Sequence, residues 1–178
     1  MQSQALRRKL GHAIVGFALA GVTAGCGEMA NPVQPSASGG GLSLRAAVGL
    51  PFNGRLEGVY TLAFPGPTTL VVSGEGTGNA TQLGRFTFEY DETVDLTTGT
   101  GTGTYEFTAA NGDTLTAHWT GYGLPTETPT VLLVIENATI TGGTGRFANA
   151  SGSFTIERLF DFVTNSGGGS IEGTVRLR

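Results

Sequence analysis

The chain has 178 residues, which is enough for one domain and an export segment. Only 13% of the residues are charged and 30 are glycines, a composition that favours β-structure over amphipathic helices. The formal net charge is −4 and there is no long run of like charge, so the chain lacks the electrostatic footprint of a nucleic-acid-binding protein.

The N-terminus is predicted to be a signal peptide that covers residues 1–25. Three cations, Arg7, Arg8 and Lys9, precede an apolar stretch over residues 10–22. This stretch is shorter than the roughly 20 residues that a membrane-spanning helix needs. The pattern therefore indicates export rather than a transmembrane segment.

The apolar stretch ends in the small residues Thr-Ala-Gly, followed by Cys26, the only cysteine in the chain. Small residues before a single cysteine resemble the lipobox of bacterial lipoproteins. This resemblance implies cleavage after Gly25 and acylation of Cys26, and two or more acyl chains anchor a protein stably. Gly27 stands where an aspartate would signal retention in the inner membrane, so we expect an envelope protein anchored in the outer membrane. The alternative is an ordinary secretory leader with an incidental cysteine.

Residues 26–53 are predicted to be the lipidated cysteine and a tether. The part over residues 27–41 is rich in Gly, Pro and Ser and has few apolar side chains with which to pack. A short helix or an additional strand is expected near residues 42–50, and Pro51 ends it.

Residues 54–178 are predicted to form one β-domain. Eight segments alternate between apolar and polar residues with a period of two. They cover residues 55–64, 69–78, 84–91, 102–109, 113–121, 131–140, 152–162 and 170–177. Because the turns between them are short, each strand can pair with the next, which favours an eight-stranded antiparallel up-and-down barrel. A β-sandwich is the alternative.

The apolar phase of these segments is rich in aromatic residues, whereas the other phase is rich in threonine. We expect the aromatic phase to face the interior, which in an eight-stranded barrel is either filled by side chains or just wide enough for one small ligand. Phe162 is placed on the same inward phase as Phe154 and Phe160. The predicted core consists of Phe86, Phe88, Tyr105, Phe107, Trp119, Phe154 and Phe160.

The run ITGGTGRFANASGSFT over residues 140–155 has the glycine spacing of a dinucleotide-binding turn. Such a turn must be followed by a helix whose N-terminus binds the pyrophosphate, but the residues that follow alternate like a strand. We therefore expect a structural corner in which glycines take left-handed backbone angles and a phenylalanine closes the barrel end. The corner residues are Gly142, Gly143, Gly145, Phe147 and Gly152.

The sequence GGTGRF, followed by small residues, Gly152 and a strand, resembles the corner of the allene oxide cyclase and dirigent barrel superfamily. The match covers about fifteen residues. It implies an eight-stranded barrel that binds its substrate without a cofactor, and it implies a homotrimer. No catalytic residue is carried over, because only the corner aligns.

Few residues are of the types that usually act in catalysis or bind metal ions. After Cys26 the only histidine is His118, on the polar phase of its segment, so no metal site, cofactor or catalytic residue is predicted. Glu136 and Arg158 interrupt apolar phases. If both face inward, they supply the polar lining of a ligand pocket together with Trp119 and Tyr105. The alternatives are a β-bulge that shifts the phase, or positions at an open rim.

The expected function is that of a cell-envelope lipoprotein whose barrel has a structural or binding role without catalysis. Its expected partners are the membrane and a small hydrophobic ligand. The alternative is a carrier, or a cofactor-free enzyme similar to allene oxide cyclases or dirigent proteins, that acts on such a ligand inside the barrel. A continuous internal cavity favours the alternative, and a filled barrel favours the first function.

The lipid anchor predicts that Cys26→Ala releases the protein from bacterial membranes or blocks its processing, because two or more acyl chains are needed for stable anchoring. Fractionation of cells and mass spectrometry of the mature N-terminus test this expectation. An unmodified Cys26 in the mature wild-type protein would refute it.

Overall fold

A computed structural model describes residues 49–177, and the predicted leader, Cys26 and the tether up to residue 48 lie outside the described residues. In the described part, no helix has the length and apolar character needed to cross a membrane. The elements are strands and one short 3-10 helix, η1. They are β1 (Leu50–Pro51), β2 (Gly54–Gly66), β3 (Thr69–Ala80), β4 (Gly84–Asp95), β5 (Thr100–Ala109), β6 (Thr114–Pro125), β7 (Val131–Gly143), η1 (Gly145–Phe147), β8 (Ser151–Asp161) and β9 (Ser166–Arg176).

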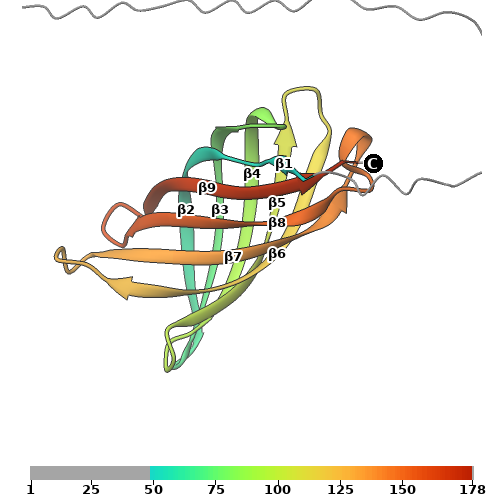
Figure 1. Cartoon of the computed structure of the whole chain (residues 1–178). Helices are drawn as coiled ribbons and strands as arrows, with labels where there is room; N and C mark the ends of the chain where they lie inside the picture. The colour runs from blue at the N-terminus through green and yellow to red at the C-terminus, as the bar shows by residue number, and fades with distance from the viewer. Residues whose placement is uncertain (1–48, 178) are drawn as a thin grey trace, which may run out of the picture. The chain divides into compact units, whose positions relative to one another are not determined.

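Strands β2 to β9 form a closed eight-stranded antiparallel barrel (Figure 1). Each strand pairs with the next in the chain, and β9 returns to pair with β2 over Gly54–Val59. The two-residue strand β1 adds to β9 outside the barrel, with Leu50 opposite Val175. The predicted up-and-down barrel is confirmed, and the sandwich alternative is wrong.

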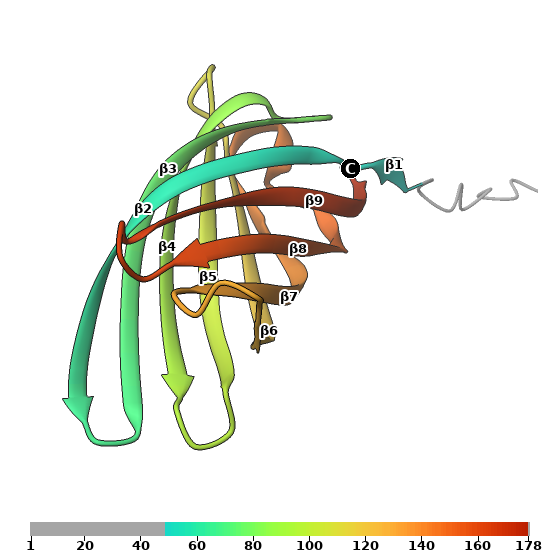
Figure 2. The same ribbon diagram turned by 90° about the vertical axis from the view of Figure 1, so that its left-hand side faces the viewer.

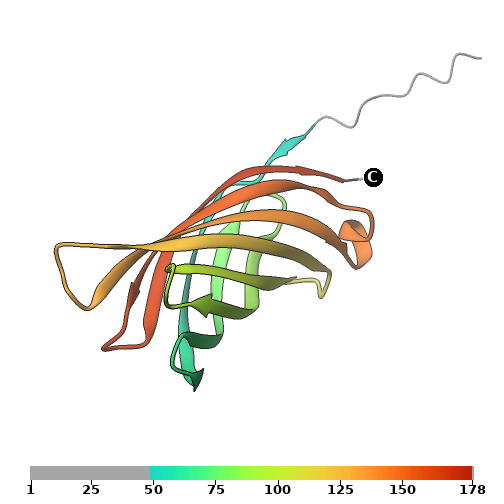
Figure 3. The same cartoon turned by 90° about the horizontal axis from the view of Figure 1, so that it is seen from below.

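The two ends of the barrel differ in how they are covered. At the end that we name the closed end lie the β3–β4, β5–β6 and β7–β8 connections and the last residues of β9, and the side chains of Phe52 and Phe147 are fully buried. At the other end, the open end, lie the β2–β3, β4–β5, β6–β7 and β8–β9 hairpins, some of which project well beyond the barrel wall (Figure 2). Figure 3 shows the strands curling around the interior between these ends.

The interior is aromatic, as the alternation predicts. All seven predicted core residues are buried, with relative exposures of 5% or less. Their rings contact one another closely: Phe86 and Phe107 meet edge to face with centroids 5.3 Å apart. Phe162 does not belong to this core, because β8 ends at Asp161 and the side chain after it is 40% exposed.

The strands are longer than the alternation alone indicates. Gly167, Gly168 and Gly169, which resemble a turn in sequence, lie within β9 and pair with both β2 and β8. A Cβ atom at Gly169 would overlap the backbone of Glu157 and would lie 2.6 Å from Cα of Arg158. The glycines therefore allow β9 to approach its neighbours at the point where it closes the barrel.

The glycine-rich corner between β7 and β8 is a compact turn. The φ angles of Gly142, Gly143, Gly145 and Gly152 are 135°, 155°, 53° and 145°, all in the region that favours glycine. The register shifts by one residue at the end of β7, where a β-bulge precedes the turn. Only the three-residue helix η1 follows, so no helix N-terminus is formed that resembles a pyrophosphate site.

Substitution of Gly143 tests whether this corner depends on glycine. Gly143→Ala should lower the free energy of unfolding by more than about 2 kcal/mol, because it combines a positive φ with overlap against the carbonyl oxygen of Thr114. Gly112→Ala, at a φ of 86° in open space, should cost about 1 kcal/mol. Denaturant unfolding measures both, and equal costs would show that the close approach at Gly143 is unimportant.

Candidate functional site

Glu136 and Arg158 form an ion pair inside the barrel. Glu136 on β7 is 0% exposed and Arg158 on β8 is 2% exposed. Nε and Nη2 of Arg158 lie 2.9 Å and 2.7 Å from Oε1 of Glu136. Both residues keep the inward phase of their strands, so the alternatives of a phase-shifting bulge or an exposed rim are wrong.

Tyrosine hydroxyls complete the surroundings of this pair. Tyr105 donates a hydrogen bond of 2.6 Å to Oε2 of Glu136, and Tyr90 lies 3.4 Å from Oε1. Nη2 of Arg158 also donates to the hydroxyl of Tyr90. Burial lowers the pKa of Arg158, but Glu136 and the neighbouring tyrosines raise it, and the balance is well above its usual value. The guanidinium therefore stays charged.

A second carboxylate, Glu92, joins this group from β4. Its Oε2 accepts a hydrogen bond from Tyr90 and lies 3.7 Å from Nη2 of Arg158. Burial raises the pKa of Glu92 to about 6, although the hydrogen bond from Tyr90 and the charge of Arg158 oppose the shift. We refer to Glu92, Glu136, Arg158, Tyr90 and Tyr105 as the buried polar cluster.

The sequence interpretation missed Glu92, although the signal for it was present. Glu92 continues the inward phase of Phe86, Phe88 and Tyr90, and β4 extends to Asp95, beyond the predicted end at residue 91. A charged residue on an aromatic phase is the same signal that identified Glu136 and Arg158.

A pocket of about 140 Å³ lies at the open end of the barrel, above the buried polar cluster. Judged by their positions along the strands, Glu92 and Arg158 lie at its base, and most of its wall is apolar. Of the residues predicted to line a pocket, Arg158 does so, whereas Glu136, Tyr105 and Trp119 lie deeper in the packed interior. The lining residues are Leu70, Val72, Glu92, Val94, Leu96, Gly99, Gly101, Tyr122, Gly123, Leu132, Val134, Arg158, Phe160 and Phe162.

Exposed apolar side chains also lie at the open end of the barrel. Of the nine exposed large hydrophobic residues in the described part of the chain, six lie at or beside the four hairpins of the open end. Three of them also line the pocket, so its apolar wall continues onto the surface. The six residues, which we name the apolar rim, are Phe64, Leu96, Tyr122, Leu124, Phe162 and Val163.

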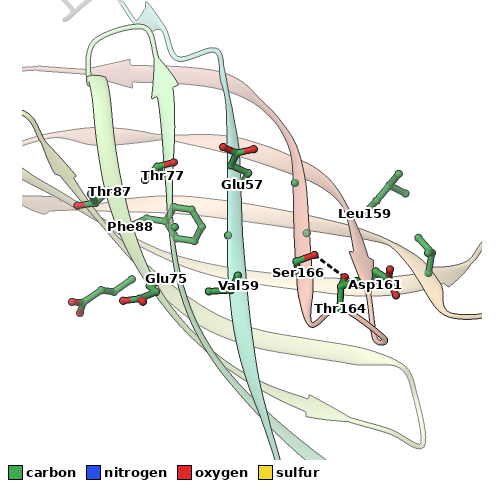
Figure 4. Close-up of a pocket in the computed structure, with 16 residues that line it drawn as sticks. Glu57, Val59, Glu75, Thr77, Thr87, Phe88, Leu159, Asp161, Thr164 and Ser166 are labelled. Carbon is green, nitrogen blue, oxygen red and sulfur yellow. Dashed lines mark hydrogen bonds between the residues drawn. The ribbon is translucent and has the colours of Figure 1, made fainter.

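A larger hollow lies on the outer surface of the barrel (Figure 4). Gly58, Gly76, Gly167 and Gly168 are among its lining residues, and the ring of Phe88 lies behind the strands, since a Cβ atom at Gly58 or Gly76 would meet that ring. The glutamates that line it, such as Glu57 and Glu75, are exposed to water. The hollow is therefore a shallow groove without buried charge, and the pocket at the open end is the better candidate for a site.

The remaining residue with catalytic chemistry, His118, lies on the outer face of β6 and is exposed. It is not near the buried polar cluster, since its neighbours Ala117 and Trp119 are the residues of β6 that face inward. Within residues 49–177, no group of three or more His, Cys, Asp or Glu side chains is arranged to hold a metal ion.

The ion pair predicts that Arg158→Met lowers the free energy of unfolding by about 3–5 kcal/mol, because Glu136 is left buried without its cation. The double variant Arg158→Met/Glu136→Gln should recover a large part of this loss, since the amide oxygen still accepts from Tyr105. Arg55→Met, at an exposed position on β2, is the control and should change stability by less than about 0.5 kcal/mol. Denaturant unfolding measures the free energy of unfolding of all three variants. A double variant as unstable as Arg158→Met would contradict the pairing.

Comparisons of the chain with models of protein families, with curated proteins and with solved structures find no match. The function of the barrel is therefore inferred from the chemistry of its open end. That end combines an apolar wall and an apolar rim with two partly or fully buried charged groups, Glu92 and Arg158.

Proposed function

We propose that the protein is a binding protein of the bacterial cell envelope that takes one small, mainly apolar molecule into the open end of its barrel. The observation that carries the proposal is the pocket with apolar walls and with Glu92 and Arg158 at its base. Apolar pockets with a few converging polar groups are the usual form of small-molecule sites.

The size of the pocket limits the part of the ligand that enters. At about 140 Å³ it is close to a known apolar cavity of about 150 Å³ that binds benzene. A ligand cannot enter more deeply, because Trp119 stacks on Tyr90 with ring centroids 5.6 Å apart. Further aromatic rings fill the barrel from there toward the closed end. One ring or a short alkyl chain therefore fits, and any longer apolar part would lie on the apolar rim.

The envelope location in this proposal is supported by the sequence of residues 1–27, which resembles a signal peptide with a lipobox at Cys26. The GGTGRF corner resembles that of allene oxide cyclase and dirigent barrels, and this chain likewise forms a closed eight-stranded barrel. A binding role agrees with both, because barrels of that kind receive their substrate inside the barrel.

A second candidate function is that of a cofactor-free isomerase or cyclase, and one observation favours it. Glu92 lines the pocket, and burial raises its pKa to about 6, so its carboxyl group can exchange a proton near neutral pH, as a general acid or base must. The two functions differ in what happens to the ligand: a binding protein returns it unchanged, whereas an enzyme returns a product. Chromatography of the ligand recovered from the protein distinguishes them.

Binding of toluene tests the pocket itself. The wild-type protein should bind toluene in a 1:1 ratio in calorimetry, and Leu132→Trp should weaken this binding at least tenfold because the larger side chain fills the pocket. Leu133→Trp is the matched control: the neighbouring residue of β7 does not line the pocket, so binding should persist. Wild-type protein without affinity for toluene, or Leu132→Trp with unchanged affinity, would contradict the proposed site.

A further inference from the structure

We propose that the closed end of the barrel is a docking surface for the headgroups of anionic phospholipids. Docked in this way, the barrel stands on the membrane with its pocket facing away from it. The proposal rests on the envelope location in the proposed function, because the expected lipid anchor at Cys26 brings the barrel to the membrane. It is carried by the distribution of charge along the barrel and by the place where the chain enters it.

The exposed cationic side chains of the described part of the chain lie at the closed end. Residues 49–177 contain no lysine, and of their arginines only Arg158 is buried. Asp113 is the only acidic residue in the closed-end connections and in the last three residues of each strand at that end. The exposed arginines in the same part of the barrel are Arg55, Arg85, Arg146 and Arg176.

The open end has the opposite charge. Its hairpins carry Asp95, Glu127 and Asp161, and within the described residues they contain no arginine or lysine. Exposed charges are screened over about 10 Å at 0.1 M ionic strength. The barrel is longer than this, because its strands have 10 residues or more and rise about 3.3 Å per residue. A membrane therefore responds to the charge of the nearer end more than to the net charge of the chain.

The closed-end arginines are available to bind anions. Within residues 49–177, no acidic side chain forms an ion pair with Arg55, Arg85 or Arg176. Nε of Arg146 lies 4.0 Å from Oδ2 of Asp113, and the arginine side chain is 47% exposed. A guanidinium group can form two parallel hydrogen bonds with the oxygens of one phosphate group, so phosphodiester headgroups are suitable partners.

Three of these arginines lie on one side of the closed end. Arg55 on β2 and Arg85 on β4 both stand opposite Asn79 on β3, so only one strand separates them. Nη2 of Arg146 lies 3.5 Å from the carbonyl oxygen of Leu83, which precedes β4. The guanidinium of Arg146 therefore reaches across the end of the barrel toward the strand that carries Arg85.

The chain enters the barrel at the same end. Strand β1 pairs with the last residues of β9, with Leu50 opposite Val175, and the two lie side by side in Figure 2. The closed end can therefore approach the membrane without the chain first passing along the barrel wall. An anchor at Cys26 keeps the barrel within the reach of residues 27–48, at most about 3.5 Å per residue. Because the headgroups are then at a high local concentration, a weak attraction is enough to orient the barrel.

The apolar rim at the open end is the competing surface. Docking there would bring the acidic residues of the open end to an anionic membrane and would cover the pocket. Of the exposed large hydrophobic residues in the described part, only Leu50 lies at the closed end, so docking of the closed end depends on charge. Salt weakens an attraction between exposed charges but not the insertion of apolar side chains, so it distinguishes the two surfaces.

Binding to vesicles tests the closed end without the anchor. The chain over residues 26–178 with Cys26→Ala cannot be acylated, so it can be held only by its own surface. At about 0.05 M salt it should bind vesicles of phosphatidylglycerol and phosphatidylcholine about tenfold more tightly than vesicles of phosphatidylcholine alone, because each arginine near an anionic surface adds to the attraction. At about 0.5 M salt this preference should disappear.

A triple variant locates the preference. Arg55→Gln/Arg85→Gln/Arg176→Gln removes positive charge from the closed end and should reduce the preference for phosphatidylglycerol about tenfold. Arg146 is kept, because its guanidinium lies 4.7 Å from the centroid of the ring of Phe147 and helps to cover it. Arg85→Gln alone should give a smaller loss in the same direction, and it disturbs the barrel least.

The matched control makes the same change of net charge at the other end. Phe64→Glu/Leu124→Glu/Val163→Glu replaces the residues of the apolar rim that do not line the pocket. This variant should keep the preference of the wild-type chain, because the added charges lie farther than a screening length from the docked end. If the rim were the docking surface, the same variant would lose its binding to vesicles.

The orientation of the anchored barrel gives a second readout. Cys26 is the only cysteine in the chain, so its reaction with a maleimide lipid reproduces the anchor. On vesicles with phosphatidylglycerol, Arg85 should react with phenylglyoxal severalfold more slowly than on phosphatidylcholine, because headgroups cover it. Glu127 should react with a water-soluble carbodiimide equally fast on both. Mass spectrometry of peptides measures both rates.

The outcomes separate the docking surface from the function on which it rests. The docking surface is wrong if the arginine variants keep the preference, if the preference persists at about 0.5 M salt, or if Arg85 reacts equally fast on both kinds of vesicle. If toluene still binds in that case, the binding function stands. If the headgroup preference is found but toluene does not bind, the pocket fails and the docking surface stands.

Discussion

The ion pair between Glu136 and Arg158 determines how the interior of this barrel is divided. A charge in a medium of low dielectric constant is tolerated only beside an opposite charge and hydrogen-bond partners. The pair meets this need with Tyr105 and Tyr90, whose rings belong to the aromatic core. The polar groups therefore lie in one layer across the barrel. Between that layer and the closed end, aromatic rings fill the interior. Between it and the open end, the wall is apolar and a pocket remains.

The aromatic half depends on a pairing of large and small residues on neighbouring strands. A Cβ atom at Gly78 would overlap the ring of Phe86, and one at Gly103 would lie 2.7 Å from the ring of Trp119. The rings therefore occupy space that side chains at these glycines would otherwise fill. This explains why a chain with 30 glycines still forms a packed interior, since many glycines provide room for rings rather than flexible turns.

The alternation of residues was enough to predict the barrel, its strand order and its aromatic core, because each is set by a local period of two and by short turns. The pairing of Glu136 with Arg158 could not be predicted from the alternation, because the two residues lie 22 positions apart and meet diagonally across β7 and β8. The run Gly167–Gly169 was wrongly interpreted as a turn for a related reason. Three consecutive glycines are typical of a turn, and only the pairing of β9 with both β2 and β8 shows that they belong to a strand. The pocket depends on all of these contacts together, so only its inward charges were visible in the sequence.

The order of groups along the axis of the open end implies how the ligand of the proposed binding site would be oriented. Glu92 and Arg158 lie deepest, the aliphatic wall follows, and the apolar rim lies at the surface. A polar group must therefore cross the apolar wall first and give up its water before it meets its partners, which favours a neutral group over a charged one. In the proposed complex the apolar part of the ligand would lie near the rim, where Leu96, Tyr122 and Phe162 contribute both to the pocket and to the exposed surface. In the same proposed complex the rim would cover the end of a short ligand and would provide a surface for the tail of a longer one.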